Sequence, residues 1–243
     1  MARKVQLAIA NAKGGVGKST VAVNLAAELA AIGYMTLLID CEPQADASAH
    51  LGIAPAAPNL VEVLTGSAGI TRAIVKARDG LDLITGDERL TDLDTSEFPL
   101  DRLQAAAASL LPSYDAVIAD CPPTLTGLAG NAIVAVGEVL CPVIPDYLSF
   151  RRIEQVEQRC EVLGARLRWI VAGNANVQRA LTADVLAELR RRYPKQLART
   201  YIRTDARLAE APAWGKTVRE HAPSSHGAAD YAALTQELIH AKT

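Results

Sequence analysis

Short apolar runs alternate with longer stretches of helical periodicity along this 243-residue chain. Each run has the length of a buried strand, and continuous apolar strands separated by helices indicate a parallel sheet covered on both faces. Right-handed crossovers between such strands place ligands beyond their carboxyl ends. The predicted strands are Val5–Ala10, Thr36–Asp40, Leu81–Thr85, Ala116–Asp120, Val139–Ile144 and Leu167–Ala172.

The helical patterns are clearest near the start of the chain and in its last third. Predicted helices cover Val21–Ile32, Ala183–Arg192 and Ala228–His240, and Thr182 is expected to be the N-cap of the second. Residues 52–59 are loop-like, but no linker, repeat or change of composition demands a second domain. We therefore expect one α/β domain over residues 1–243, with a mostly parallel, twisted sheet flanked by helices on both faces.

Composition narrows the class of protein. Half of the residues are apolar and 21% are charged, which is typical of a globular domain, and the longest apolar stretches are too short to span a bilayer. Four cysteines without CxxC spacing indicate buried thiols in a reducing compartment, and Met1-Ala2-Arg3-Lys4 opens no signal peptide. A cytoplasmic protein is expected.

The charge is unevenly distributed, although the net charge is only −2. Residues 1–150 hold 9 Lys and Arg against 17 Asp and Glu, a balance of −8, whereas residues 151–243 hold 16 against 10, a balance of +6. A basic C-terminal third can direct one face toward phosphates, or it can simply reflect arginine on exposed helix surfaces.

A glycine-rich loop between the first strand and the first helix predicts a phosphate-binding site. It reads Lys13-Gly14-Gly15-Val16-Gly17-Lys18-Ser19-Thr20. Its glycines let backbone N–H groups point at phosphate oxygens, and a helix that begins near Gly17 adds the positive end of its dipole. Lys18 would reach the β- and γ-phosphates of ATP, and Ser19 would offer its hydroxyl to Mg²⁺. The general P-loop pattern has glycine at position 12, where this chain has Ala12, and Lys13 is an additional lysine.

Two further predicted strands end on a carboxylate, Asp40 and Asp120. The carboxyl ends of parallel strands meet at the edge of the sheet where the phosphate loop lies. A carboxylate there can hold Mg²⁺ directly or through water, so both residues are candidate metal ligands. The alternative for either residue alone is a helix cap or a turn.

The loop with its extra lysine resembles the deviant Walker A motif of the ParA/MinD group of P-loop ATPases. Three other segments are similar to that group: Asp40–Ser48 to its D-x-D-P-Q segment, Asp115–Pro123 to its Walker B region, and Arg207–Lys216 to the R-L-A-E-A-P segment of chromosomal and plasmid partition ATPases. The last segment favours the ParA branch. The resemblance spans nearly the whole chain.

The resemblance implies a mechanism and assigns roles by position. ATP brings two monomers face to face, Lys13 crosses to the partner's phosphates, Asp40 and Asp120 serve Mg²⁺, and Glu42 orients the attacking water. The family usually has Asp at position 42, so slow hydrolysis is expected, because one extra methylene moves the carboxylate. Base contacts are expected at Asn174 and Asp205, although residues 203–205 depart from the family's Pro-Arg-Asn.

The resemblance also implies partners. The ATP-bound dimer would bind DNA without sequence preference through Arg207 and, as a looser match, Arg179, and a ParB-type adaptor would stimulate release from the nucleoid. No helix-turn-helix is expected ahead of the phosphate loop. Two alternatives stay open: a MinD-like membrane-positioning ATPase, which needs a basic amphipathic C-terminal helix unlike Tyr231–Thr243, and an ATPase that positions a protein cluster on the nucleoid. An iron–sulfur ATPase would need paired cysteines that Cys41 and Cys121 do not supply by spacing.

Overall fold

A computed structural model describes residues 4–95, 97–176 and 178–241 of the chain, and within these residues seven strands form one sheet. The strands are β1 (Val5–Ile9), β2 (Thr36–Asp40), β3 (Ile74–Arg78), β4 (Leu81–Ile84), β5 (Ala116–Asp120), β6 (Glu138–Val143) and β7 (Arg166–Ala172). The helices are α1 (Lys18–Ala31), α2 (Asp46–His50), α3 (Leu60–Thr65), α4 (Arg102–Ala107), α5 (Gly127–Val136), α6 (Ser149–Val162), α7 (Ala180–Arg192), α8 (Ala206–Glu210), α9 (Val218–His221) and α10 (His226–His240). Short 3₁₀ segments are η1 (Ile70–Ala73), η2 (Glu88–Leu93), η3 (Leu111–Ser113) and η4 (Ala211–Trp214).

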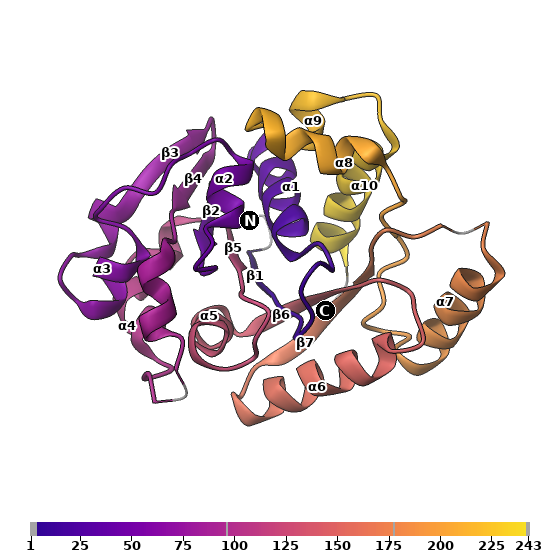
Figure 1. The fold of residues 1–243 in the computed structure, drawn as a ribbon, viewed down its shortest axis with the longest axis horizontal. Helices are drawn as coiled ribbons and strands as arrows, with labels where there is room; N and C mark the ends of the chain where they lie inside the picture. Colours follow the sequence, from indigo (N-terminus) through magenta and orange to yellow (C-terminus); the bar gives the residue numbers. More distant parts are fainter. Residues whose placement is uncertain (1–3, 96, 177, 242–243) are drawn as a thin grey trace.

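The strand order is β3-β4-β2-β5-β1-β6-β7, and all neighbours are parallel except β3 and β4 (Figure 1). Strand β5 lies at the centre, between β2 and β1. In its register Asp120 is opposite Asp40 on one side and Ile9 on the other. The phosphate loop and both candidate metal ligands therefore meet at the carboxyl edge of three adjacent strands.

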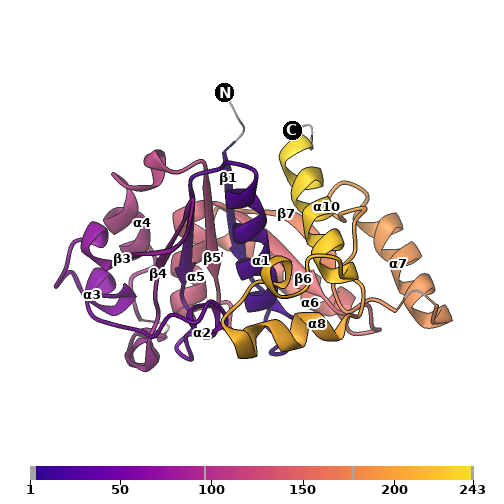
Figure 2. The ribbon, with the colours of Figure 1, turned by 90° about the horizontal axis from the view of Figure 1, so that it is seen from above.

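The two faces of the sheet carry separate apolar cores, because successive strand side chains alternate between faces. On β5, Val117 and Ala119 pack toward α3, α4, α5 and α6, whereas Ala116 and Ile118 pack toward α1 and α10. Figure 2 shows α1 and α10 together on one side of the sheet, with α2 and α8 at the edge where ligands are expected. Both faces are covered, as the continuous apolar runs predict.

The six predicted strands are confirmed to within one residue at each end. The three predicted helices end within one residue of the expected position but begin two or three residues earlier, at Lys18, Ala180 and His226. The prediction that Thr182 caps α7 is wrong: Arg179 occupies the N-cap position, and Thr182 is buried inside the first turn. All four cysteines are buried free thiols, as expected.

Candidate nucleotide and magnesium site

The phosphate loop joins β1 to α1 and takes its shape from two glycines. Gly15 has φ +71°, and Gly17, the N-cap of α1, has φ +87°. Both values lie in the left-handed region that glycine adopts without strain. The first helical residue is Lys18, which agrees with the start near Gly17 expected from the glycine-rich loop and not with the later start at Val21 expected from the apolar pattern. The first N–H groups of α1 have no partner within the helix and are directed at the loop.

Asn11 fixes the start of this loop. Its Oδ1 accepts a hydrogen bond from the backbone N of Lys13 at 2.9 Å, and its Nδ2 donates to the carbonyl oxygen of Pro142 on β6 at 2.8 Å. Lys18 is only 7% exposed, and its Nζ reaches back to the carbonyl oxygen of Lys13 at a long 3.4 Å. Its ammonium thus lies inside the curve of the loop, where a phosphate would be bound.

Asp120 provides the clearest test of whether these residues fit a magnesium ion. The carboxylate is fully buried, and among the described residues neither of its oxygens has a hydrogen-bond partner. Burial raises the pKa of Asp120 well above its usual range, with the charge of Asp40 as a further cause, while Ser19 and Lys18 act in the opposite direction. Unpartnered buried anionic oxygens beside a hydroxyl fit a hard cation that prefers oxygen ligands. Asp120 and Ser19 would hold Mg²⁺.

Asp40 is placed differently. Its Oδ2 accepts hydrogen bonds from the backbone N of Ser48 at 2.8 Å and from the Ser48 hydroxyl at 2.6 Å, and its Oδ1 accepts one from the N of Glu42 at 3.2 Å. Burial raises the pKa of Asp40 to about 6, and these hydrogen bonds lower it. Because both oxygens already bind the turn into α2, this arrangement favours contact with Mg²⁺ through water.

Glu42 lies on the wall of the cavity that the phosphate loop borders. This cavity has a volume of about 290 Å³ and is lined by Gly14, Gly15, Gly17, Lys18, Ser19, Thr20, Glu42, Gln44, Asp46 and Pro123. Burial raises the pKa of Glu42 to about 7, Lys18 lowers it, and the carboxylates of Asp46, Asp40 and Asp94 raise it. A half-protonated carboxyl near neutral pH facing the phosphate cavity is suited to orienting a water molecule.

A second cavity of about 310 Å³ adjoins the other side of the phosphate loop. Asn174 and Asp205, the expected base contacts, both line it, and Val16 and Thr20 border it from the loop. Both carboxylate oxygens of Asp205 already accept hydrogen bonds, from the backbone N of Arg207 at 3.0 Å and of Gly227 at 2.8 Å, which leaves them less available to contact a base. The sequence does not predict the apolar walls, which lack any motif: Ile144, Ile202, Leu208 and Tyr231.

Lys13 and Arg207 both stand at the surface. The Lys13 side chain is 40% exposed, and its Nζ lies 3.7 Å from Asp146, which hydrogen-bonds Arg152 more closely, at 3.0 and 3.1 Å. Arg207 on α8 pairs with Glu210, whose carboxylate also faces His221 at 3.3 Å. Arg179 is exposed at the start of α7, and Figure 2 shows that α7 lies apart from α8, which carries Arg207.

Two structural features are absent from the part of the chain that the structure describes. Among the described residues, no group of three or more His, Cys, Asp and Glu side chains is arranged to hold a metal ion. Within the same residues, no helix combines the length and apolarity needed to cross a membrane.

The buried carboxylates predict an unusual pH dependence of stability for the metal-free protein. The native pKa of Glu42, about 7, lies above its ordinary value of 4.5, so the folded state retains this proton to higher pH than the unfolded chain. The free energy of unfolding should therefore fall as pH rises between these values, and Asp40 and Asp120 act in the same direction. Urea unfolding in EDTA at pH 6 and pH 8 measures the difference.

The Asp120→Asn variant provides the matched control. Because a neutral amide is less costly to bury than an unpaired carboxylate, this variant should be more stable than the parent at pH 8 by about 1–2 kcal/mol. Its dependence on pH should also be weaker. A variant less stable than the parent at pH 8 would show that Asp120 is well satisfied in the folded protein.

The chain is similar to known ATPases over most of its length. Residues 4–170 match the AAA domain family. The chain is 34% identical to the chromosome-partitioning ATPase Soj of Thermus thermophilus, over 96% of this chain and 95% of that protein. It is 33% identical to the chromosome partitioning protein ParA of Caulobacter vibrioides, over 96% of this chain and 93% of that protein. Its fold is similar to that of the septum site-determining protein MinD of Pyrococcus horikoshii, solved with Mg-ADP, with a TM-score of 0.82 at 22% identity, over 98% and 96% of the two chains.

Proposed function

Because this chain belongs to the AAA domain family and to the ParA-type partition ATPases of the ParA/MinD group, we propose that it is a DNA-partition ATPase that couples Mg·ATP to reversible DNA binding. In this proposal residues 1–243 form one ATPase domain. ATP and Mg²⁺ drive a sandwich dimer that binds DNA without sequence preference in the nucleoid. Hydrolysis, stimulated by a ParB-type adaptor, releases it.

The observation that carries the proposal is the arrangement of charges around the phosphate loop. The cation of Lys18 is buried inside the loop, and the orphaned carboxylate of Asp120 lies beside Ser19 at the end of the adjacent strand. When bound, Mg²⁺ would neutralise phosphate charge and help orient the γ-phosphate. Asp120 and Ser19 would hold the ion, and Asp40 would act on its water shell while holding the turn into α2.

The chain's own groups account for the remaining parts of hydrolysis. Lys18 and the N–H groups at the start of α1 stabilise charge on the phosphates. Glu42, which lines the same cavity, accepts a hydrogen bond from the attacking water and aligns it. The second cavity, with Asn174 and Asp205 on its wall, is placed to receive the nucleoside. Intrinsic hydrolysis is expected to be slow, because the longer Glu42 side chain positions water less rigidly than Asp would.

DNA binding is assigned to the basic C-terminal third. The α8–η4–α9 segment carries three exposed cationic residues, Arg207, Lys216 and Arg219. The segment is fixed to α1, since Asn24 accepts a hydrogen bond from the N of Val218 at 2.8 Å and Glu28 binds Arg219 at 3.0 Å. Helix α1 begins in the phosphate loop, so nucleotide and DNA surfaces share one rigid element. Arg179 on α7 would add a phosphate contact from a separate element.

Reversing the charge of Arg207 tests the DNA surface. We expect Arg207→Glu to weaken binding to a random-sequence duplex in Mg·ATP by about 30-fold at low salt, because it replaces an attraction to phosphate by a repulsion. Affinity for Mg·ATP should be unchanged. Fluorescence anisotropy as a function of salt measures both the affinity and the number of phosphate contacts.

Lys76→Glu is the matched control, because Lys76 is an exposed cation on the edge strand β3, with a side chain 70% exposed. It changes the net charge equally and should leave DNA binding within about twofold of the parent. If the two variants weaken DNA binding equally, the overall charge of the protein explains the effect and not a local surface. If Arg207→Glu binds DNA as the parent does, Arg207 is not part of the DNA surface.

The alternative function is membrane positioning, because the fold of this chain is similar to that of MinD. It requires an amphipathic C-terminal helix with an available apolar face. In α10 that face is already packed: Tyr231, Leu234 and Leu238 are at most 3% exposed and contact the core beside α1. Sedimentation with anionic liposomes in Mg·ATP separates the two functions, and the partition proposal requires that the protein stay in the supernatant.

A further inference from the structure

We infer that Asp94 is a positioning residue, and that the segment Gly86–Asp94 braces two loops that both line the phosphate cavity. The first loop, Asp40–Asp46, carries Glu42, and the second, Asp120–Thr126, carries Pro123; both Glu42 and Pro123 line the cavity. This inference rests on the proposed ATP hydrolysis. None of the residues Gly86–Asp94 belongs to a motif of the sequence.

The first end of this brace segment is in backbone contact with the Glu42 loop. A Cβ atom at Gly86 would lie 2.7 Å from the carbonyl oxygens of both Asp40 and Glu42. Backbone atoms cannot turn aside as a flexible side chain can, so only glycine permits this approach. Gly86 lies two residues beyond the end of β4, which pairs with β2 in parallel, so the contact continues the sheet beyond the strand ends.

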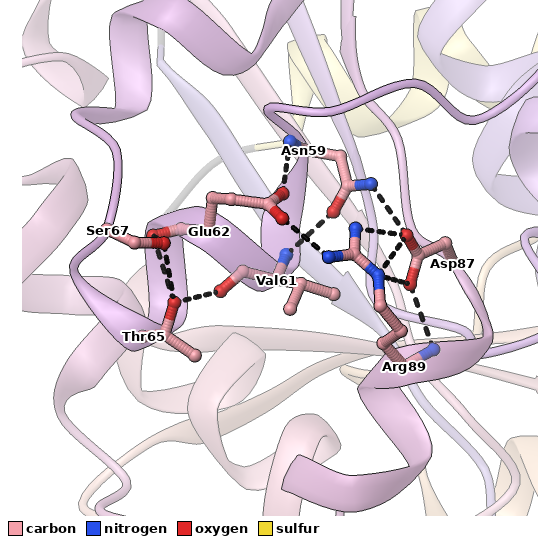
Figure 3. A network of polar contacts seen from close by, with 7 residues as sticks. All are labelled: Asn59, Val61, Glu62, Thr65, Ser67, Asp87 and Arg89. Carbon is pink, nitrogen blue, oxygen red and sulfur yellow. Dashed lines mark hydrogen bonds and ion pairs between the residues drawn. The ribbon is translucent and has the colours of Figure 1, made fainter.

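A polar network fixes the next residues of the brace segment to α3 (Figure 3). Arg89 binds Asp87 through paired hydrogen bonds and donates to Glu62 at 2.6 Å. Asn59 donates to Asp87 at 2.8 Å and accepts from the N of Val61 at 2.9 Å, which caps α3. Asp87 also caps η2, because it accepts a hydrogen bond from the N of Arg89 at 2.9 Å. Asp87 therefore fixes the brace segment both to η2 and to the N-cap of α3.

The other end of the brace segment caps α5. The N-cap residue of α5, Thr126, makes no side-chain cap, and the Oδ1 of Asp94 instead accepts the hydrogen bond from the N of Leu128 at 2.9 Å. Gly127 has φ +46°, and a Cβ atom there would overlap the Oδ1 of Asp94. A carboxylate at a helix N-terminus also interacts favourably with the helix dipole. Asp94 thereby fixes the point at which the Asp120–Thr126 loop ends.

These contacts have a consequence for catalysis. Both loops are tied to one nine-residue segment, so the distance between Glu42 and the Asp120 loop depends on that segment. Arg159 of α6 also holds the second loop, by donating to the carbonyl oxygen of Leu125 at 2.6 Å. Loss of the Asp94 carboxylate should therefore displace the loop rather than unfold it, and small displacements of this kind can reduce a rate up to about 100-fold.

Steady-state ATPase assays of three variants test the assignment. We expect Asp94→Ala to lower kcat about tenfold with KM for Mg·ATP within about twofold, since the phosphate loop itself is untouched. Asp94→Asn keeps an acceptor oxygen for the N of Leu128 and should retain at least about a third of the parental kcat. Asp92→Ala, on the exposed side of η2, is the matched control and should leave kcat unchanged. Parental kcat in Asp94→Ala, or an equal loss in Asp94→Asn, would overturn the assignment.

A second pair of variants addresses the other end of the brace segment. Gly86→Ala should lower kcat by about tenfold or more, because the new methyl group pushes the Asp40–Glu42 backbone away. Gly69→Ala is its control, since a Cβ at Gly69 has no atom within 4 Å. Normal kcat in a folded Gly86→Ala variant would contradict the brace.

Amide hydrogen exchange separates this inference from the proposed function. Asp94→Ala should speed exchange at Leu128 and in the Asp120–Thr126 loop about tenfold in the nucleotide-free protein, whether or not the parent hydrolyses ATP. A parent without Mg·ATPase activity would defeat the proposed function. Unchanged exchange in that loop would defeat the brace.

Discussion

Replacing Lys18 with alanine is expected to weaken Mg·ATP binding by about 100-fold or more and to abolish hydrolysis. Lys18 is 7% exposed and its ammonium lies inside the phosphate loop, so its interaction with the phosphates is little screened by solvent. Charge-assisted hydrogen bonds to charged groups contribute about 1.5–3 kcal/mol each, and Lys18 can donate more than one. Isothermal titration calorimetry with a non-hydrolysable ATP analogue and Mg²⁺ measures the loss directly.

The control for this variant is Lys4→Ala. Lys4 is exposed, and its Nζ donates a hydrogen bond to the carbonyl oxygen of Pro112. It lies just before β1, at the opposite end of that strand from the phosphate loop. Its replacement should leave the Kd for nucleotide within about twofold of the parent. Far-UV circular dichroism shows whether the Lys18→Ala protein is folded, and a folded variant that binds Mg·ATP with parental affinity would remove the loop from the nucleotide site.

The pattern of apolar residues along the sequence predicts most of the strands and helices of the fold. Strands β2 and β5 were expected at the observed bounds, because each is a continuous apolar run that ends on a carboxylate. The antiparallel edge strand β3 was not predicted: its side chains are only partly buried, so its sequence shows neither a continuous apolar run nor a clear alternation. Helix starts were predicted late, since cap and first-turn residues do not follow the apolar period.

In the candidate site, too, some residues can be predicted from local sequence and others only from the folded structure. Local motifs identify the phosphate loop, Asp40 and Asp120, because their backbone geometry is set within a few residues. They do not show that Asp40 is committed to Ser48, nor that Asp94 caps a helix that begins 33 residues later, at Gly127. Such contacts depend on which loops the sheet order brings together. Side-chain pairing, such as that of Arg207 with Glu210, is likewise set by the folded surface.

In the proposed dimer, Lys13 is the residue that would link association to nucleotide. Its backbone is fixed, since its N donates to Asn11 and its carbonyl oxygen accepts from Lys18. Its side chain is held only by an ion pair of 3.7 Å to Asp146, and such partly exposed pairs contribute about 1 kcal/mol or less. In the proposed dimer, the ammonium would leave this partner at little cost and reach across the two-fold interface to the phosphates of the second subunit.

We accordingly expect Lys13→Ala to bind Mg·ATP within about threefold of the parent while its ATP-dependent dimerisation weakens by about 100-fold. DNA binding should be lost with the dimer. Analytical ultracentrifugation with and without Mg·ATP measures the association, and Lys195→Ala, at another exposed lysine, controls for the loss of one surface charge. Because the backbone contacts of the loop remain, a loss of dimer together with retained nucleotide affinity assigns the trans contact to the ammonium itself. A Lys13→Ala protein that still dimerises at parental concentrations would place that contact elsewhere.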